Sequence, residues 1–385
     1  MPSRSVLARR YDSGDPVRAT IADGRLAEIV PLWTREPLDD WPWIAPGFFD
    51  LQLNGYGGIW FSDERLTVEQ VLEVLARYPR HGVTRLCPTL ITNSQAALRH
   101  GLATIRAACE REPWADAMVA GCHLEGPHIS LEDGPRGAHP LAHVRPCSLS
   151  EFEELNAASG NRVRLATLAP ECPGAPDFIR GLVERRVAVA IGHTAATPEQ
   201  IAAAVDAGAA FSTHLGNAAH RVLPRHPNYL WDQLGEPRLA ASVISDSHHL
   251  PASVLRSIVA AKTPERIIIT CDASGLAGCE PGVHETPLGT FEMLDDGRIV
   301  IAGQRTLLAG SGLMTDACVA FMLQATGVRL REACDMAGRV PATMLGLPAG
   351  RLLPGEPANL ALFRWSRASR RIDVLETFCP AGPPG

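Results

Sequence analysis

The chain has 385 residues, of which 46% are hydrophobic and 20% charged, and its formal net charge is -6. This length suits a barrel of about 250 residues with a smaller unit beside it. The composition excludes extended disorder, and the negative charge argues against general nucleic-acid binding. No apolar run reaches ~18 residues and no apolar targeting segment is seen at the start, so we expect a cytoplasmic protein without a membrane span.

The two ends of the chain are predicted to form one small β domain. Residues 1–45 contain short, β-like segments and turns, and residues 349–385 repeat this pattern around a Pro-Gly turn. Both segments could pair into a β-sandwich domain that joins the chain ends. Residues 46–348 would then form the larger, catalytic domain.

Within the larger domain one pattern recurs, in which a short apolar run ends in polar residues and an amphipathic stretch follows. The apolar runs cover residues 47–55, 83–91, 118–126, 163–171, 187–194, 209–217, 239–249 and 266–274. Eight strands alternating with helices predict a (β/α)8 TIM barrel of α/β class. An open doubly wound sheet is the alternative, but its G-x-G-x-x-G turn is missing. Residues 276–307 contain an Asp-Asp-Gly hairpin signal and are expected to leave the barrel after strand eight.

Metal-binding and proton-transfer residues follow several of these strands, at the end where barrel enzymes place their active sites. Glu125, His193 and His214 form the best ligand set, because two histidines and a carboxylate with an open position are typical of hydrolytic Zn²⁺. Asp272 ends the most apolar strand and is the best general base, able to orient a water and pass its proton to a leaving amine. The alternatives are a helix cap for Glu125 and a turn for Asp272.

A second metal is not supported by the residues on strand one. Gln52 and Asn54 share one face of that strand, and amides are weak metal ligands beside imidazole. Lys262 is the single lysine and lies in a helix-like stretch, which excludes a bridging carbamylated lysine. We therefore expect one divalent ion per chain, with Zn²⁺ favoured and Fe²⁺ as the alternative.

Seven motifs follow one another in a fixed order and are continued by a tail at residues 341–363. The motifs are PGFFDLQLNGYGG (46–58), HLEGPHIS (123–130), AIGHTAAT (190–197), STHLGNAAH (212–220), ISDSHHL (244–250), TCDASGLAG (270–278) and LAGSGLMT (308–315). Together they resemble the N-acetylglucosamine-6-phosphate deacetylase family of amidohydrolases, in which Gln-x-Asn replaces the His-x-His of other members on the first strand.

This resemblance implies that an N-acetyl amino sugar phosphate, above all N-acetylglucosamine-6-phosphate, is hydrolysed to acetate and the amino sugar phosphate. It places Glu125, His193 and His214 on the metal, Asp272 on the catalytic aspartate, and His249 on the carbonyl side of the substrate. The residues that it places on the substrate are His139, Asn217, Ala218, Arg225, Leu308, Ala309 and Gly310.

Arg225 follows His214 at the same distance along the chain as an arginine of the family that reaches into a neighbouring subunit to hold the sugar phosphate. The resemblance therefore also implies a homodimer. An ordinary surface arginine is the alternative. His220 and residues 226–235 depart from the family pattern near the substrate. Two other functions stay open. The chain could be an amidohydrolase for another N-acyl or cyclic amide substrate, or a binding protein on an inactive fold. The complete ligand set argues against the binding protein.

Overall fold

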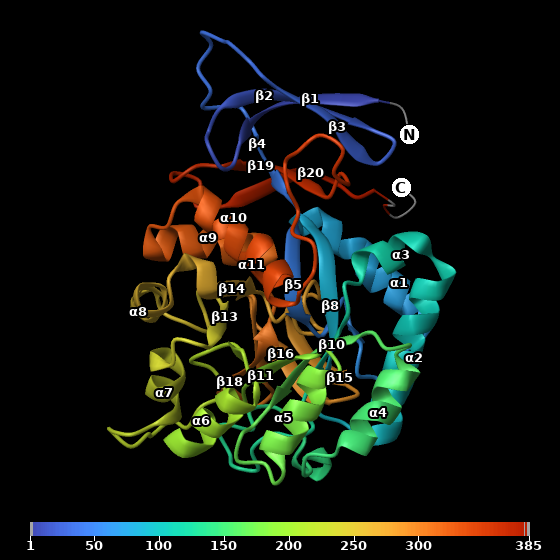
Figure 1. Cartoon of the computed structure of the whole chain (residues 1–385), viewed down its shortest axis with the longest axis vertical. Coiled ribbons are helices and arrows are strands. Elements are labelled where there is room, and N and C mark those ends of the chain that lie inside the picture. The colour runs from blue at the N-terminus through green and yellow to red at the C-terminus, as the bar shows by residue number, and fades with distance from the viewer. Residues whose placement is uncertain (1–2, 381, 383–385) are drawn as a thin grey trace.

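The computed structural model describes residues 3–380 and residue 382. At its centre lies a parallel eight-stranded sheet in the order β14-β13-β12-β11-β10-β9-β8-β5 (Figure 1). The strands are β5 (Phe48–Leu53), β8 (Val83–Ile91), β9 (Cys122–Glu125), β10 (Val163–Leu168), β11 (Ala188–Ile191), β12 (Phe211–Ser212), β13 (Ala240–Ile244) and β14 (Ile267–Thr270). Each of the eight predicted apolar runs contains one of them, which confirms the (β/α)8 barrel.

The first and last strands close the barrel. Leu53 pairs with Ala273 in a parallel bridge just beyond β14. Asp50 on β5 is fully buried, and its carboxylate accepts hydrogen bonds from the Thr270 hydroxyl and, at 2.9 Å, from the Cys271 backbone N–H. A buried carboxylate is stable only when such donors replace water, so these bonds join β5 firmly to β14.

Helices follow the strands and cover the outside of the barrel (Figure 1). They are α1 (Val68–Arg77), α2 (Gln95–Arg111), α3 (Pro113–Met118), α4 (Leu149–Ala158), α5 (Ala175–Glu184), α6 (Pro198–Ala207), α7 (Tyr229–Gly235), α8 (Ala252–Lys262), α9 (Thr315–Thr326), α10 (Leu330–Met336) and α11 (Arg339–Met344). The start and end of α6 follow from its sequence: Thr197 caps it, Pro198 opens it, and Gly208 ends it with a left-handed φ of 115°.

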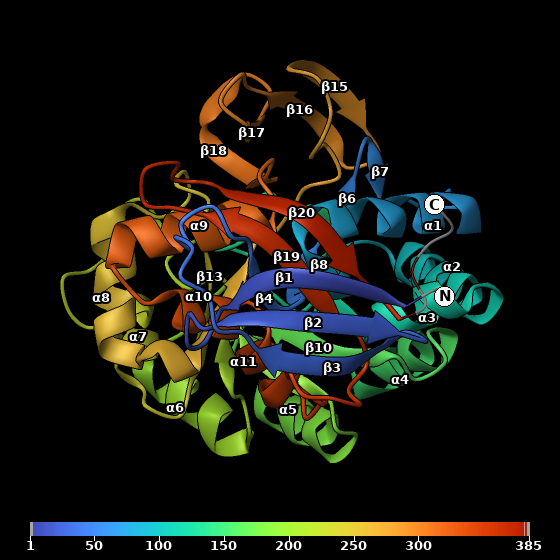
Figure 2. The same ribbon diagram turned by 90° about the horizontal axis from the view of Figure 1, so that it is seen from above.

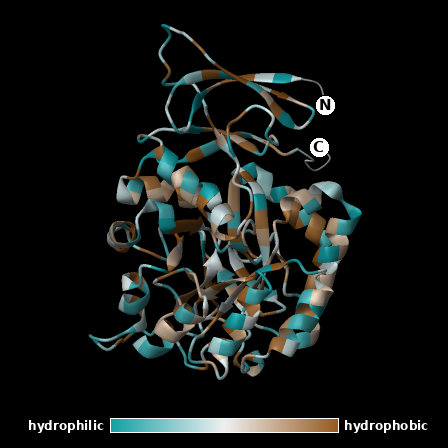
Figure 3. Ribbon diagram, in the orientation of Figure 1, coloured by the Kyte–Doolittle hydropathy of each residue, from teal (hydrophilic) through white to brown (hydrophobic). Residues whose placement is uncertain are grey.

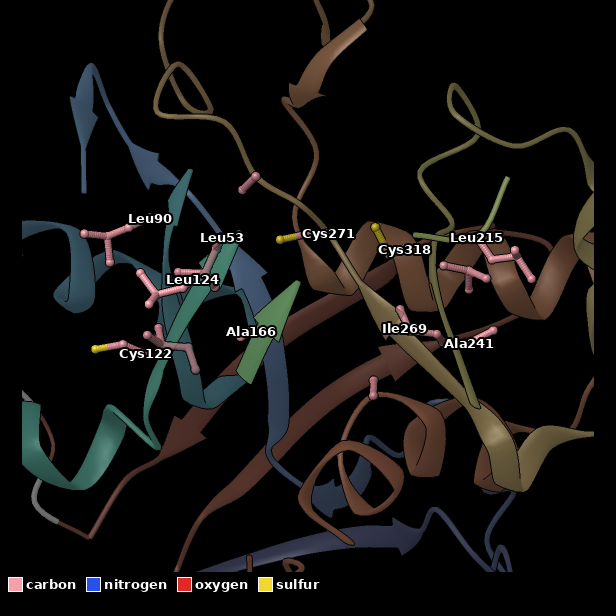
Figure 4. Packing of buried hydrophobic residues seen from close by; sticks show 14 of the residues in the cluster. Leu53, Leu90, Cys122, Leu124, Ala166, Leu215, Ala241, Ile269, Cys271 and Cys318 are labelled. Atoms are coloured by element: carbon pink, nitrogen blue, oxygen red, sulfur yellow. The ribbon is translucent and has the colours of Figure 1, made fainter. Parts of the chain in front are cut away.

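The core lies mainly between the strands and these helices. Ile267 and Ile269 of β14 pack toward the helices, whereas Ile268 points into the barrel, as the alternation of a strand requires. Figure 4 shows part of the outer layer, with Leu124 and Cys271 among its side chains. Figure 3 shows hydrophilic and hydrophobic residues alternating along the helices, the amphipathic pattern of a covering layer. Among the described residues, no helix has both the length and the apolar character of a membrane span.

Strands from both chain ends form a second sheet in the order β20-β19-β4-β1-β2-β3, seen above the barrel in Figure 1. Its strands are β1 (Arg4–Arg10), β2 (Pro16–Ala22), β3 (Arg25–Pro31), β4 (Trp43–Pro46), β19 (Leu360–Trp365) and β20 (Ile372–Phe378). β19 runs antiparallel to β4, with Leu362 opposite Ile44. Because β4 leads directly into β5, this small β domain adjoins the end of the barrel where the strands begin.

A third, antiparallel sheet leaves the barrel after β14, as the Asp-Asp-Gly signal predicts. It consists of β15 (Gly282–Thr286), β16 (Gly289–Met293), β17 (Arg298–Ile301) and β18 (Gln304–Ser311), and the Asp-Asp-Gly segment makes the turn between β16 and β17. Figure 2 shows this sheet beside the hairpin of β6 (Gly55–Tyr56) and β7 (Ile59–Trp60), which follows β5. Trp60, Phe291 and Ile299 pack together between the two.

Candidate active site

A cavity of about 410 Å³ opens at the end of the barrel where the strands finish. Ligand pockets measure about 300–1,000 Å³, so a small molecule can enter it. The residues assigned from the sequence that line it are Asn54, Glu125, His139, His193, His214, Asn217, Ala218, His249, Asp272, Leu308, Ala309 and Gly310. Gln52 does not line the cavity but contacts Glu125, and Arg225 lies outside it.

Glu125, His193 and His214 form one buried cluster, called here the metal group. Glu125 ends β9, and the two histidines come shortly after β11 and β12. The Oε1 atom of Glu125 lies 3.1 Å from the Nε2 atom of each histidine, and the two Nε2 atoms are 3.1 Å apart. In the barrel β11 and β12 are neighbours, and β10 separates β11 from β9. The ends of these three strands thus bring the three side chains to one point.

The metal group fits a divalent cation. Two neutral imidazoles and a carboxylate direct lone pairs at the same point, which is repulsive unless a proton or a cation lies between them. Burial by itself raises the pKa of Glu125, but protons placed between it and His193 and His214 would outweigh this through their hydrogen bonds and positive charges together, and these hold the pKa well below its usual range. An ionised carboxylate beside two histidines is a donor set typical of hydrolytic Zn²⁺.

The surrounding backbone fixes how the metal group and Asp272 point. The Nδ1 atom of His193 donates to the carbonyl of Pro135 at 3.0 Å, which leaves Nε2 free to bind a metal. His193, His214 and Asp272 have left-handed φ angles of 51°, 31° and 50°. Such angles are uncommon outside glycine and concentrate at active sites, where the surrounding structure holds them.

The two amides of strand one bind the carboxylates of the site. Gln52 Nε2 donates to Glu125 Oε1 at 2.6 Å, and Asn54 Nδ2 donates to Asp272 Oδ1 at 2.8 Å. Each contact occupies a carboxylate lone pair that a second ion would need. Among the described residues, the metal group is the one cluster of three or more His, Cys, Asp or Glu side chains suited to share an ion.

Asp272 is placed to exchange a proton with a bound molecule. Burial raises the pKa of its carboxyl to about 8, and the negative charge of Glu125 adds to the rise. A divalent ion in the metal group would act in the opposite direction. The Asp272 carboxyl lines the cavity, is oriented by Asn54, and has a pKa set by these opposing effects. It is therefore suited to act first as a general base and then as a general acid.

Two further histidines line the cavity. His139 Nδ1 lies 2.8 Å from the Thr92 hydroxyl, and its ring centroid is 4.2 Å from that of His193. Burial lowers the pKa of His139 well below its usual range, and His193 adds to this, so His139 is a neutral hydrogen-bonding group. His249 has its Nδ1 atom 2.7 Å from Asp246.

The remaining predicted substrate contacts come from strand β18 and from the loop after β12. Residues 308–310 lie on β18, which approaches β14 closely at Gly310, where φ is 74°. A Cβ atom at Gly310 would lie 3.0 Å from the carbonyl oxygen of Asp272, so glycine permits this approach. Asn217 and Ala218 come from the loop after β12.

Arg225 is exposed on the loop that precedes α7. In Figure 1 this loop extends away from the barrel at the lower left. No arginine or lysine is among the described residues that line the cavity. Among the described residues, the cavity lining thus offers no permanently positively charged side chain for a phosphate.

An apolar wall of the cavity, formed by Trp60, Leu288 and Phe291, was not identified from the sequence. The rings of Trp60 and Phe291 stack with centroids 5.8 Å apart. Trp60 is 4% exposed, and its indole N–H has no hydrogen-bond partner among the described residues. The available signal was a tryptophan directly after strand one, where barrel loops carry binding residues.

His220 also lines the cavity, although the sequence marked it only as a departure from the family pattern. Its Nδ1 atom lies 3.0 Å from the Tyr229 hydroxyl and its Nε2 atom 3.1 Å from Glu132. The contact with Glu132 connects the loop after β9 with the loop after β12 at the rim of the cavity, and the contact with Tyr229 ties the latter loop to the start of α7.

Known proteins with the same sequence pattern are deacetylases. Human N-acetylglucosamine-6-phosphate deacetylase is 38% identical over 314 residues, which cover 79% of this chain and 75% of the human protein. N-acetylgalactosamine-6-phosphate deacetylase of Escherichia coli O157:H7 is 34% identical over 350 residues, or 90% of each chain. No protein-family model matches the chain. The chain belongs to the N-acetylglucosamine-6-phosphate deacetylase family of the amidohydrolase superfamily.

Solved structures of this deacetylase family share the fold over the whole chain. A mutant N-acetyl-D-glucosamine-6-phosphate deacetylase from Mycobacterium smegmatis, in complex with N-acetyl-D-glucosamine-6-phosphate, has a TM-score of 0.85 and 27% identity, and 98% of each chain is covered. The deacetylase from Pasteurella multocida has a TM-score of 0.83 with 25% identity over 98% of each chain.

Proposed function

We propose that the chain removes the acetyl group from an N-acetyl amino sugar 6-phosphate. N-acetylglucosamine-6-phosphate is the expected substrate, with acetate and glucosamine-6-phosphate as products. The observation that supports this best is that the metal group and Asp272 line one cavity in a chain of this family. In this proposal residues 46–348 are the catalytic domain, and residues 1–45 and 349–385 form the small β domain.

Hydrolysis forms a bond from a water oxygen to the acetyl carbon and breaks the carbon–nitrogen bond. Asp272 accepts a proton from the attacking water and later returns a proton to the amine nitrogen, so that acetate and the free amine leave. His249 donates from Nε2 to the acetyl oxygen as negative charge develops there.

Glu125, His193 and His214 would hold one divalent ion, with Zn²⁺ favoured and Fe²⁺ as the alternative. When bound, that ion supplies Lewis acidity, which makes a water molecule more acidic and a carbonyl more electrophilic. Gln52 and Asn54 orient the carboxylates of Glu125 and Asp272 through the hydrogen bonds described above.

Substrate recognition uses the loops around the cavity. His139, Asn217, Ala218 and residues 308–310 contact the sugar and its acetyl group. Arg225 from a second copy of the chain binds the phosphate, because a guanidinium group can donate two parallel hydrogen bonds to it. The described residues that line the cavity include no lysine or arginine, which supports this arrangement. Because a second copy contributes Arg225, the active form in this proposal is a homodimer.

The proposal is tested by acetate release from a panel of sugars with purified protein loaded with Zn²⁺ or Fe²⁺. We expect the fastest turnover with N-acetylglucosamine-6-phosphate and much slower turnover with unphosphorylated N-acetylglucosamine. Faster turnover of N-acetylgalactosamine-6-phosphate would move the assignment to that sugar, the substrate in the name of the Escherichia coli relative. A preference for unphosphorylated or non-sugar amides would favour another N-acyl substrate, and failure to bind metal would favour a binding protein.

A further inference from the structure

Asp246 is a buried carboxylate that the chemistry above does not use. It lies after β13 and is 2% exposed. Its Oδ2 atom lies 2.7 Å from Nδ1 of His249 and accepts a hydrogen bond from the Ser311 hydroxyl at 2.9 Å. Its Oδ1 atom accepts the backbone N–H groups of His248 and His249, both at 2.9 Å.

The contacts of Asp246 determine which nitrogen of His249 carries a proton. An ionised carboxylate only accepts hydrogen bonds, so Nδ1 of His249 must be the donor. Burial by itself raises the pKa of Asp246, but the hydrogen bond and charge of His249, together with the two backbone N–H groups, outweigh it and lower the pKa to about 2. Nε2 has no hydrogen-bond partner in the part of the chain that the structure describes, and the His249 ring lines the cavity.

We propose that Asp246 is a positioning residue, which holds His249 with its Nδ1–H on the carboxylate and its Nε2 toward the substrate. Asp246 also stabilises the doubly protonated ring. A neutral imidazole with its proton on Nδ1 can only accept at Nε2, so it needs the second proton to donate to an acetyl oxygen. This inference rests on the proposed function, in which His249 makes that donation.

Asp246 is the main electrostatic partner of His249, as the other groups around these two residues show. Ser311 from β18 donates a hydrogen bond to Asp246, and the buried thiol of Cys318 from α9, whose pKa is raised by burial and in part by the nearby charge of Asp246, is uncharged. His248 has its Nε2 atom 3.0 Å from the carbonyl of Asp296 in the turn between β16 and β17. Asp272 and Glu125 are the acids that share the cavity with His249, and among the described residues neither makes an ion pair with it.

Asp246→Asn is a sharp test because the structure dictates how the amide must lie. Two backbone N–H groups point at the Oδ1 position, so the amide oxygen stays there. The NH₂ group then occupies the Oδ2 position and donates to Nδ1 of His249. This reverses the tautomer: the proton moves to Nε2, and the ring loses the negative partner that supports its positive charge.

The experiment records ring ¹⁵N spectra of Zn²⁺-loaded protein with labelled histidine, using His249→Gln to assign one signal among the 13 histidines. We expect a proton on Nδ1 of His249 in the parent protein and the Nε2–H form in Asp246→Asn. The variant should keep its metal content and lose about 10-fold in kcat with little change in KM, because its neutral Nε2–H is a weaker donor than the doubly protonated ring.

Asp316→Asn is the matched control, since Asp316 pairs with His81 Nδ1 at 3.1 Å outside the cavity. It should change neither the His249 signal nor kcat. An Nε2–H tautomer in the parent protein would overturn the proposal even if Asp246→Asn fails to fold, and so would a folded Asp246→Asn variant with unchanged kcat. If no sugar in the panel is deacetylated, the proposed function fails, while the ring spectra still decide the role of Asp246.

Discussion

Two parts of the same cavity are built in different ways. The metal group and Asp272 lie at the ends of barrel strands, and Glu125, His193 and Asp272 are each held by a buried hydrogen bond outside the metal group. The apolar wall of Trp60, Leu288 and Phe291 comes instead from β7 and from the sheet that leaves the barrel, and it leaves an indole N–H without a described partner.

This difference separates the reaction from the recognition of the substrate. Strand ends are rigid because hydrogen bonds to neighbouring strands fix them, which suits groups that must meet at one point. Loops and an added sheet tolerate change, which suits the part of a cavity that selects a substrate. Such a division is compatible with the two different sugars in the names of the human and Escherichia coli relatives.

Removing the metal should have the largest effect. We expect purified protein to contain about one divalent ion per chain, because Gln52 and Asn54 occupy the carboxylates that a second ion would need. A chelator should reduce acetate release to background, and one equivalent of Zn²⁺ should restore it. Elemental analysis that found two tightly held ions per chain would show that the strand-one amides do not exclude a second site.

The next largest effect is expected at Asp272. Asp272→Asn keeps the hydrogen bond to Asn54 possible but removes proton transfer, so kcat should fall by about 10²-fold or more. Metal content and thermal stability should stay close to those of the parent protein. Near-normal kcat in this variant would mean that Asp272 is structural and that the reaction uses another base.

Arg225 tests whether recognition extends beyond a single chain. Arg225→Ala should raise KM for the phosphorylated sugar by roughly 10- to 150-fold, as expected for a lost charge-assisted contact of about 1.5–3 kcal/mol. KM for the unphosphorylated sugar should change little, because no phosphate is present to bind. Equal losses on both sugars would identify Arg225 as structural, and a monomeric active enzyme would exclude a contribution from a second copy.

The smallest effect is expected at the apolar wall. Trp60→Phe preserves an aromatic ring for stacking on Phe291 and removes the indole N–H together with one of the two fused rings. If that N–H donates to the substrate, KM should rise by roughly 2- to 10-fold, the value of one neutral hydrogen bond, with kcat unchanged. Leu288→Ala is the matched control for general loosening of the wall. An unchanged KM in Trp60→Phe would limit this wall to packing.

The sequence by itself determined the barrel and the meeting of Glu125, His193 and His214 at one point. The alternation of apolar runs and amphipathic stretches identified all eight strands, although β12 is only two residues long where nine were predicted. Because parallel strands end at one edge, Glu125, His193 and His214 could be expected to meet without knowledge of any packing. Thr197 and Gly208 likewise set the ends of α6 through local hydrogen bonds and backbone conformation.

Only the tertiary structure decided which distant segments complete the cavity. Trp60 and Phe291 lie far apart in the chain, and their stacking depends on how the β15–β18 sheet folds back beside β7. The bond from Ser311 to Asp246 likewise joins β18 to the loop after β13, and it helps to hold the carboxylate that faces His249. Such contacts carry no periodic signal in the sequence, because they follow from side-chain packing between elements rather than from the local conformation of either one.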